Sequence, residues 1–260
     1  TAIGFSQAYP ILFMVDQPLG IYWGAETDGV YSSWEEANTS GIAGAAPGEI
    51  RYINHHVDLD DSGQPLEIQE INFDDYVKIG DPNPDFTYSI SNNFTYKNWD
   101  ASILFTGQKG GDLFWVDSWQ LSGLQKTTNI LSSSYANSWI APLTYQNGNY
   151  IYDESIGNLN SASHPGAMIE TGSRAISSDR NIFDGSFIRL KNINIGYNFD
   201  LKNGKNMRIY LAGQNLVVWT DYPGYDPEVR TYTKNPQKRG VDFGTYPGTR
   251  SFLMGLKLNY

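Results

Sequence analysis

The sequence contains no cysteine, few cations and no long apolar run, and each absence removes a class of function. Without cysteine, the 260-residue chain has no disulfide, no thiol nucleophile and no Cys-ligated zinc site. Its 28 acidic residues outnumber its 18 Lys and Arg, giving a formal charge of −10, which argues against nucleic acid as a partner. No stretch reaches the roughly 18 apolar residues of a transmembrane helix. Membranes are also crossed by strands of about 9–11 alternating residues, so the last absence leaves strands open.

The chain is rich in aromatic and small polar residues. Aromatic residues account for 14% of the chain, with 18 Tyr and 7 Trp, while charged residues account for only 18%. The 26 glycines, together with many Asn, Ser and Thr, suit strands joined by turns better than helices. The composition therefore predicts an all-β fold.

Two long segments alternate between apolar and polar residues as hairpins do. Over residues 86–108, a turn at Lys97-Asn98 separates two runs of period two, with Tyr96 and Trp99 beside the turn. Over residues 186–219, the turn contains Asn203-Gly204. One face of this second hairpin is mostly Asn, Gln, Arg and Gly, which a soluble core rejects but a wet lumen accepts. A half-exposed sheet of a soluble sandwich fits the first hairpin equally well.

The last nine residues form an amphipathic strand that ends on an aromatic residue. Phe252, Met254, Leu256, Leu258 and Tyr260 fall on one face, and Gly255 falls on the other. A closing barrel strand needs this pattern because it faces lipid on one side and lumen on the other. The terminus also resembles the C-terminal signal of outer-membrane barrels, for which we identify Phe252, Gly255, Leu258 and Tyr260.

Long connections alternate with the short turns. Residues 109–183 and 221–249 are rich in Gly, Ser, Asn and aromatics and lack sustained alternation. Short turns at one end and long loops at the other are typical of outer-membrane barrels. Loops this long would count against the strand assignments in a compact soluble domain.

Several distinctive strings follow one another along the whole chain. They are Thr27-Asp-Gly-Val-Tyr31, Pro47-Gly-Glu-Ile-Arg-Tyr52, Ile79-Gly-Asp-Pro-Asn-Pro-Asp-Phe86, Ser186-Phe-Ile-Arg-Leu-Lys-Asn-Ile193, Gly213-Gln-Asn-Leu216, Gly224-Tyr-Asp-Pro-Glu-Val229 and Tyr246-Pro-Gly-Thr-Arg-Ser-Phe252. In this order they resemble the C-terminal part of the SusC/RagA-type TonB-dependent transporters of the Bacteroidetes outer membrane. Each string is modest on its own, and their joint order carries the resemblance.

The resemblance implies a transmembrane antiparallel barrel of about 22 strands with long extracellular loops and an N-terminal plug. It implies import of oligosaccharides or peptides, with a SusD-like lipoprotein as lid and TonB as the source of energy. Residues 1–260 would be the C-terminal portion, without the plug, the TonB-contacting part and the earlier strands. The start at Thr1 lacks the features of a signal peptide. We therefore expect the chain to be part of a longer polypeptide in contact with outer-membrane lipid.

An acidic loop is a candidate calcium site. Asp58, Asp60, Ser62 and Gly63 match the opening of an EF-hand loop, in which hard oxygens hold the ion and glycine permits the turn. The twelfth position is Gln69 rather than a bidentate carboxylate, so Asp75 would have to complete the set. The alternative is a solvated acidic turn without metal.

Trp115, Trp119 and Trp139 in the first long connection are candidate substrate contacts, because indole faces stack on sugar rings. Packing of these rings within the loop or against the lid protein is the favoured alternative. Arg208 falls on the polar face and could meet an acidic plug residue. Arg189 shares the parity of Ile193, so it reaches the polar face only if a bulge intervenes.

Nutrient import as part of a TonB-dependent barrel is the function that the sequence favours. A self-contained small barrel with an adhesive or structural role is an alternative, which needs a strand near residue 1 to pair with the last strand. A soluble glycan-binding β-sandwich is a further alternative. An enzyme is least favoured, because no acid/base pair, nucleophile or metal set emerges from the sequence.

Overall fold

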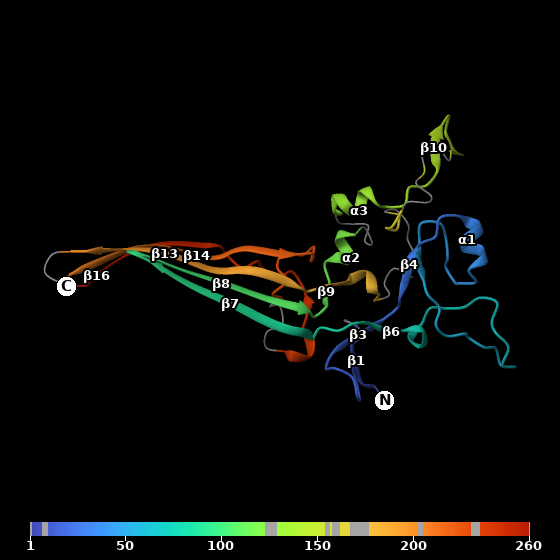
Figure 1. The fold of residues 1–260 in the computed structure, drawn as a ribbon. Helices are drawn as coiled ribbons and strands as arrows, with labels where there is room; N and C mark the ends of the chain where they lie inside the picture. The colour runs from blue at the N-terminus through green and yellow to red at the C-terminus, as the bar shows by residue number, and fades with distance from the viewer. Residues whose placement is uncertain are drawn as a thin grey trace. The chain divides into compact units, whose positions relative to one another are not determined.

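The computed structural model describes residues 2–6, 10–122, 129–153, 157, 162–166, 177–201, 205–229 and 235–259. The chain divides into two compact units (Figure 1). Unit 1 comprises Thr1–Asp81 and Phe114–Ile182, and unit 2 comprises Pro82–Leu113 and Phe183–Tyr260. None of the described helices is long and apolar enough to cross a membrane.

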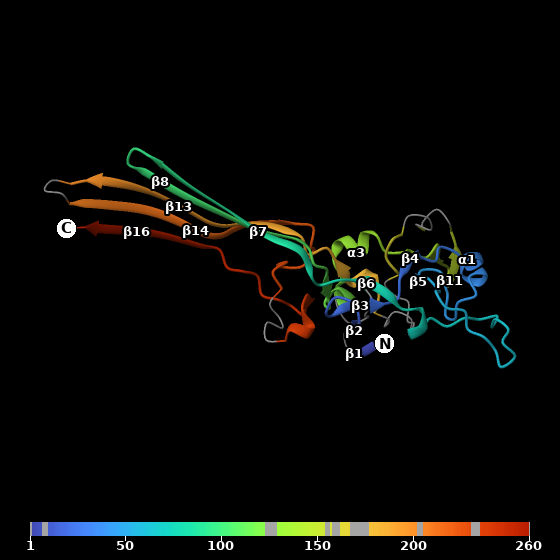
Figure 2. The same cartoon turned by 60° about the horizontal axis from the view of Figure 1, so that its bottom comes forward.

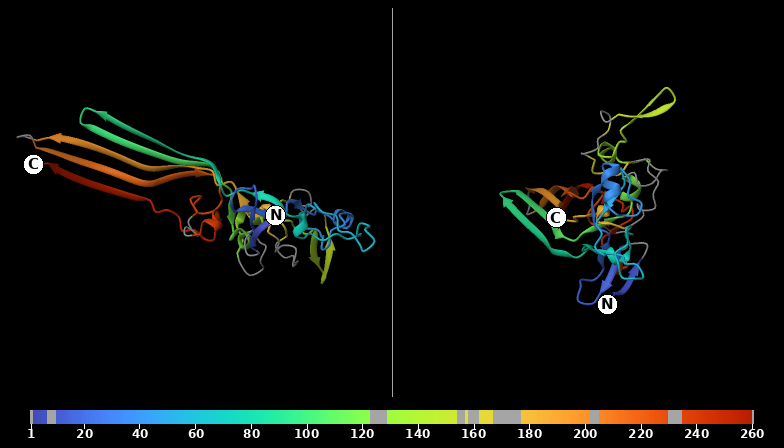
Figure 3. Two further views of the ribbon diagram at one scale, coloured as in Figure 1. Left: turned by 90° about the horizontal axis from the view of Figure 1, so that it is seen from below. Right: turned by 90° about the vertical axis from the view of Figure 1, so that its right-hand side faces the viewer.

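Unit 2 is dominated by one antiparallel five-stranded sheet with the order β16-β14-β13-β8-β7. Its strands are β7 (Pro84–Tyr96), β8 (Trp99–Gly110), β13 (Phe187–Asp200), β14 (Asn206–Thr220) and β16 (Ser251–Asn259). The long strands run side by side in Figures 2 and 3. Both hairpins that the alternation predicted are confirmed, as β7–β8 and β13–β14. Lys97 takes a φ of 53° in the first turn, as a tight hairpin turn requires.

Unit 1 is built from shorter elements. Its four-stranded sheet has the order β1-β2-β3-β6, and β4 pairs with β5. These strands are β1 (Ala2–Ser6), β2 (Ile11–Met14), β3 (Ile21–Gly24), β4 (Thr27–Val30), β5 (Ile50–Tyr52) and β6 (Val77–Gly80). β1 pairs with β2 and is the edge strand of this sheet.

Helical turns and a hairpin complete unit 1. They are α1 (Trp34–Thr39), the 3-10 helix η1 (Phe73–Asp75), α2 (Ser118–Leu121), α3 (Ser132–Ala136), β10 (Leu143–Gln146), β11 (Asn149–Tyr152) and η3 (Asp179–Asn181). A core of Ala25, Ile50 and Tyr52 is at most 5% exposed, and Ile71 and Tyr76 pack against it. Burial raises the pKa of Tyr76, and the nearby Asp75 adds to the shift. Unit 1 thus buries apolar side chains as a water-soluble fold does.

The short elements that remain lie beside the unit boundaries or in the last long connection. They are β9 (Leu113–Trp115), β12 (Ile182–Phe183), β15 (Val241–Asp242) and the 3-10 helix η5 (Pro236–Lys238). The hairpin β10–β11 was not predicted. Its Asn147-Gly148 turn, with φ values of 52° and 84°, is the signal that indicates it.

Candidate functional site

The long sheet of unit 2 carries large apolar side chains on one face, and these side chains are exposed. Strand pairing places Leu258, Leu256 and Met254 of β16 opposite Met207, Ile209 and Leu211 of β14. On the other strands, the same face carries Phe94, Ile103, Ile195 and Val217, among others. Met254 is 73% exposed, Leu211 60% and Phe94 57%. A contiguous apolar face of this kind marks a surface that meets protein or membrane.

Aromatic rings lie at both ends of this apolar face. At the short-turn end, Tyr96, Trp99 and Tyr197 are paired neighbours across three strands. The Trp99 and Tyr197 rings meet edge to face at 4.9 Å. At the other end, Tyr88 and Trp219 occupy the corresponding positions of β7 and β14. Aromatic girdles that flank an apolar band are typical of strands in a bilayer.

The opposite face of the sheet is polar and carries an ion pair that crosses a strand. Arg208 of β14 binds Asp100 of β8 with two hydrogen bonds, Nε to Oδ1 at 3.0 Å and Nη2 to Oδ2 at 2.5 Å. β13 runs between them. Its residue Gly196 pairs with Asp100 on one side and with Tyr210, two residues after Arg208, on the other. A Cβ at Gly196 would lie 2.5 Å from the Arg208 guanidinium, so glycine leaves the space for the pair. Asn194 and Asn198 add hydrogen bonds of 3.2 and 2.9 Å. The acidic partner of Arg208 among the described residues therefore lies in the same sheet, and the pair needs no plug residue.

A second charged cluster lies at the start of β13. The register of β13 shifts between Leu190 and Asn192, which is the bulge that Arg189 needs to reach the polar face. Arg189 is 3% exposed, and its Nη2 donates to Asp226 Oδ1 at 2.5 Å. The same carboxylate accepts the backbone N–H of Glu228 at 2.9 Å and of Gly248 at 3.1 Å. This cluster ties both ends of the last long connection to the sheet.

The last strand has the two faces that its alternation predicts, and its role as the closing strand of a barrel stays a prediction. β16 pairs with β14 over its whole length, with Phe252 and Leu258 on the apolar face at 80% and 52% exposure. Gly255 lies on the polar face, where a Cβ would come 2.5 Å from the Tyr210 ring. Tyr260 lies outside the described residues. The role of these residues as an assembly signal stays a prediction.

Backbone N–H groups donate hydrogen bonds to carboxylate oxygens of the acidic loop. Asp75 is fully buried, and its carboxylate accepts N–H groups from His55 at 3.0 Å, His56 at 2.9 Å and Asn72 at 2.9 Å. Asp60 Oδ1 accepts N–H groups from Ser62 at 2.8 Å and from residue 64 at 2.9 Å. Among the described residues, no group of three or more His, Cys, Asp or Glu is placed to hold a metal.

Gln69 closes this loop with its amide. Its Oε1 accepts the Asp58 N–H at 2.6 Å, and its Nε2 donates to the Leu66 carbonyl at 2.6 Å. A glutamate there could accept the first bond but could not donate the second. Hydrogen bonds therefore hold the carboxylates of Asp58, Asp60 and Asp75 in the loop. The calcium site stays a prediction, which calorimetric titration with calcium tests.

The three tryptophans singled out from the sequence lie in different settings. Trp115, in β9, is 6% exposed, so its ring has no open face for a sugar. Trp119 lies in α2, and its side chain lies outside the described part of the molecule. Trp139 lines a cleft of about 370 Å³ in unit 1, together with Trp34 and Tyr152. Trp34 and Tyr152 are 64% and 61% exposed, and neither was predicted as a contact.

A small network fixes the Trp34 side of this cleft. Ser33 caps α1 by accepting the Glu36 N–H at 3.2 Å. Ser32 donates its N–H and hydroxyl to Glu36 Oε2 at 2.7 and 2.8 Å, and Arg51 binds the other oxygen. Burial would raise the pKa of Glu36, but the hydrogen bonds from Ser32 and the Arg51 charge together hold it below its usual value. The loop that presents Trp34 is thus held by charge.

Comparison with known proteins gives a consistent set of relatives, although no family model matches the chain. The chain is 33% identical over 267 residues to the TonB-dependent receptor P3 of Formosa agariphila, covering 98% of this chain and 24% of the relative. It is 25% identical over 223 residues to the TonB-dependent receptor SusC of Bacteroides thetaiotaomicron, covering 80% and 19%. The solved structure of the RagAB peptide transporter matches with a TM-score of 0.67 at 16% identity, covering 98% of this chain and 24% of that one. The chain thus spans about a quarter or less of these relatives' length.

Proposed function

Because this chain belongs to the SusC/RagA-type TonB-dependent receptors, we propose that it forms part of an outer-membrane importer of oligosaccharides or peptides. The observation that carries the proposal is the exposed apolar face of the five-stranded sheet, flanked by aromatic rings. Such a face is complementary to hydrocarbon, and its flanking rings suit the two interfaces. The polar face, with its Asp100–Arg208 pair, then lines the lumen.

In this proposal the rest of the barrel, up to about 22 strands, and a plug complete the wall. The plug end contacts TonB, and a SusD-like lipoprotein covers the extracellular mouth. The short turns between β7 and β8 and between β13 and β14 face the periplasm. The long connection after β14, anchored by the Arg189–Asp226 pair, lies on the extracellular side.

The resemblance implies two substrate classes, and the name of one solved relative gives one of them. SusC and the P3 receptor are TonB-dependent receptors, and RagAB is a peptide transporter. The cleft lined by Trp34, Trp139 and Tyr152 offers aromatic faces, which suit sugar rings. We therefore place oligosaccharide first and peptide second.

The first test measures the receptor in native outer membranes. We expect a polypeptide about four times the length of this chain, since the chain spans 24% of its relative's length. Uptake of labelled oligosaccharide should stop when TonB is deleted. A 29.1-kDa species that reaches the outer membrane alone, or uptake that survives TonB deletion, would contradict the proposal.

A variant of the cleft tests the substrate contact. Trp139→Ala should raise the half-saturating oligosaccharide concentration roughly two- to tenfold, the worth of one aromatic contact. Tyr150→Ala is the matched control, because Tyr150 is 74% exposed on β11 and does not line the cleft. Equal effects of the two variants would exclude the cleft as a substrate contact.

A further inference from the structure

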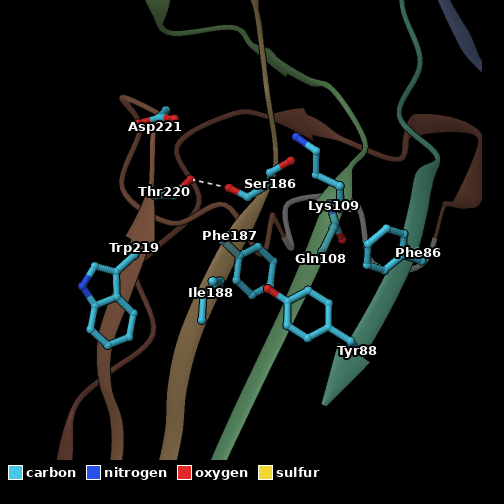
Figure 4. Close-up of a pocket in the computed structure, with 10 residues that line it drawn as sticks. All are labelled: Phe86, Tyr88, Gln108, Lys109, Ser186, Phe187, Ile188, Trp219, Thr220 and Asp221. Carbon is cyan, nitrogen blue, oxygen red and sulfur yellow. Dashed lines mark hydrogen bonds between the residues drawn. The ribbon is translucent and has the colours of Figure 1, made fainter. Parts of the chain in front are cut away.

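The cleft of unit 1 has an uncharged lining. One wall comes from the loop that leads into α1, with Trp34, and the other from the segment that leads into β10, with Trp139. None of the described residues that line it is Asp, Glu, Lys, Arg or His. Figure 4 shows a contrasting hollow of about 580 Å³ at the end of the long sheet, where the lining includes Lys109 and Asp221. The chain thus has hollows of both kinds.

Trp139 carries a hydrogen-bond donor that no described residue accepts. Its Nε1 is buried and has no acceptor in the described part of the chain. Its backbone N–H donates to the His164 carbonyl at 2.8 Å, which fixes the segment. A buried donor without an acceptor destabilises a fold, so an acceptor that a bound molecule brings is favourable. Because Trp139 lines the cleft, we expect that acceptor to be an oxygen of a molecule seated there.

The opposite wall offers hydroxyl groups and an open ring. Ser33 Oγ accepts the Glu36 N–H at 3.2 Å, and its hydroxyl can donate to a ligand at the same time. Ser32 Oγ donates to Glu36 Oε2 at 2.8 Å, and it can accept from a ligand in turn. Trp34 is 64% exposed. Ring faces with a few neutral donors and acceptors match the C–H faces and hydroxyl groups of a sugar.

Acidic residues lie directly behind this neutral lining. Glu36 is one hydrogen bond behind the Ser32 hydroxyl, and its lowered pKa keeps it ionised at neutral pH. Asp153 lies next to the cleft, because it follows Tyr152 and its N–H donates to the Pro142 carbonyl at 2.8 Å. The surroundings of the cleft therefore repel an anion rather than attract one.

The basic groups near the cleft do not offset this. Arg51 is bound by the carboxylates of Glu36 and Asp28, the second at 3.1 Å. His164 is neutral near pH 7, because burial and the Arg180 charge lower its pKa. None of these groups lines the cleft. A sulfate or carboxylate that entered would lose its hydration without meeting a cation, which is costly.

We propose that this cleft selects an uncharged sugar unit over a sulfated or carboxylated one. The sugar ring lies against Trp34, and one of its oxygens accepts the Trp139 Nε1–H. The volume of about 370 Å³ is near the lower end of the range of ligand pockets, so the cleft holds a short part of an oligosaccharide. The inference rests on the proposed function, which gives oligosaccharide as the first substrate class, and it states which sugars this class contains.

Calorimetric titration of the intact receptor with matched pairs of hexasaccharides tests the selection. Hexagalacturonic acid and hexamannuronic acid are each compared with their carboxyl-reduced forms, and laminarihexaose is compared with its sulfated form. We expect a neutral member to bind, and its anionic counterpart to bind more weakly by a factor of roughly ten or more. Tighter binding of the anionic member in any pair, or binding of no neutral member, would overturn the proposal.

Two lysine variants show whether this cleft makes the selection. Leu143→Lys places a cation in the cleft and should raise the affinity for the anionic member, relative to the neutral one, by roughly two- to fivefold. Thr144→Lys is the matched control, because the next residue of β10 lies on the opposite face and does not line the cleft. Equal effects of the two variants on this ratio would exclude the cleft as the selecting site.

Trp139→Phe separates the donor from the ring. It keeps an aromatic face and removes the N–H, so binding of the neutral hexasaccharide should weaken by roughly two- to tenfold. Unchanged binding would refute the role of Nε1. TonB-dependent uptake is measured for the same variants in cells. A receptor that imports a peptide or an anionic oligosaccharide refutes this selection alone, whereas a receptor without TonB-dependent uptake of sugars or peptides refutes the proposed function.

Discussion

Ile50 and Tyr52 in unit 1 are 3% and 5% exposed, whereas Met254 and Leu256 in unit 2 are 73% and 57% exposed. Unit 1 buries a set of apolar side chains by packing them on one another, although others such as Leu19 and Val57 are 60% and 52% exposed. In unit 2, large apolar side chains line a sheet face and meet no partner that buries them among the described residues. The buried side chain that holds the end of this sheet is instead an arginine, Arg189, at 3% exposure. Apolar packing thus stabilises unit 1. In unit 2, charged groups hold the end of the sheet, and the exposed apolar face suits hydrocarbon.

The largest loss of stability is expected where unit 2 buries a pair of opposite charges. Asp226→Ala removes one of the two carboxylates that Arg189 meets, leaving Glu228 at 2.9 Å from its Nε, and the side chains of Asp226 and Arg189 are 8% and 4% exposed. We expect a loss of about 3–5 kcal/mol in the free energy of unfolding, as for other buried pairs that lose one partner. Urea unfolding of the reconstituted receptor measures it.

Asp226→Asn is the graded control, because its amide oxygen can still accept one of the two backbone N–H groups that Asp226 Oδ1 and Oδ2 accept from Glu228 and Gly248, whereas alanine accepts neither. It should lose less stability than Asp226→Ala. If Asp226→Ala unfolds at the wild-type urea concentration, the cluster does not hold the sheet end, and the contrast between the units loses its main support.

A pair of neighbouring residues tests the two faces of the sheet directly. Met254→Arg places a cation on the apolar face, whereas Leu253→Arg, one residue earlier in β16, places it on the polar face. Near the middle of a bilayer, an arginine on the lipid side costs about 2–4 kcal/mol. We expect Met254→Arg to lose that much stability in liposomes and Leu253→Arg to lose little.

The opposite order, with the larger loss in Leu253→Arg, would show that the polar face is the buried one and that the apolar face meets water. Equal losses would show that neither face meets lipid. Heat-modifiable gel mobility, measured beside the unfolding curve, reports whether each variant assembled at all.

A smaller effect is expected from the Asp100–Arg208 pair, whose side chains are 32% and 25% exposed. Solvent reaches these groups, so we expect a coupling energy of about 1–2 kcal/mol, between the values of exposed and buried pairs. A double-mutant cycle with Asp100→Asn and Arg208→Met measures it. Gly196→Ala should lose a similar amount by displacing the guanidinium, and a coupling near zero would show that the pair is incidental.

Alternation predicted most of unit 2, because each strand has one apolar and one polar face and the turns are short. The parity of Arg189 also predicted that this side chain reaches the polar face only if a bulge intervenes, and the structure has that bulge. It did not predict that Asp100 is the partner of Arg208, because the two are 108 positions apart and no local pattern encodes their register. The six strands and two helical turns described in residues 1–81 and the hairpin β10–β11 were not predicted, since short runs carry too few periods.

The candidate sites were less predictable than the strands, for a physical reason. Asp58, Asp60 and Ser62 have the spacing of a calcium loop, but spacing does not reveal that backbone N–H groups fill the oxygens of Asp60 and Asp75. Trp115 and Trp139 look alike in the sequence, yet only Trp139 lines a cleft. Composition shows which side chains are available, whereas their partners depend on tertiary packing.

The smallest loss of stability is expected in unit 1, where charged groups hold a loop rather than a sheet. The Glu36 pKa is lowered, so the folded state favours its carboxylate, and the stability that this adds is present at neutral pH. It should be lost as the pH falls below the usual glutamate value of 4.5 and through the lowered folded value. Protonation weakens the bonds from Ser32 and Arg51, so the first turn of α1 should fray. Fluorescence of the adjacent Trp34 reports it.

Glu36→Gln should remove this acid step, whereas Glu35→Gln, which changes a carboxylate outside the network, should keep it. A step that persists in Glu36→Gln would assign the acid sensitivity of the cleft to another group.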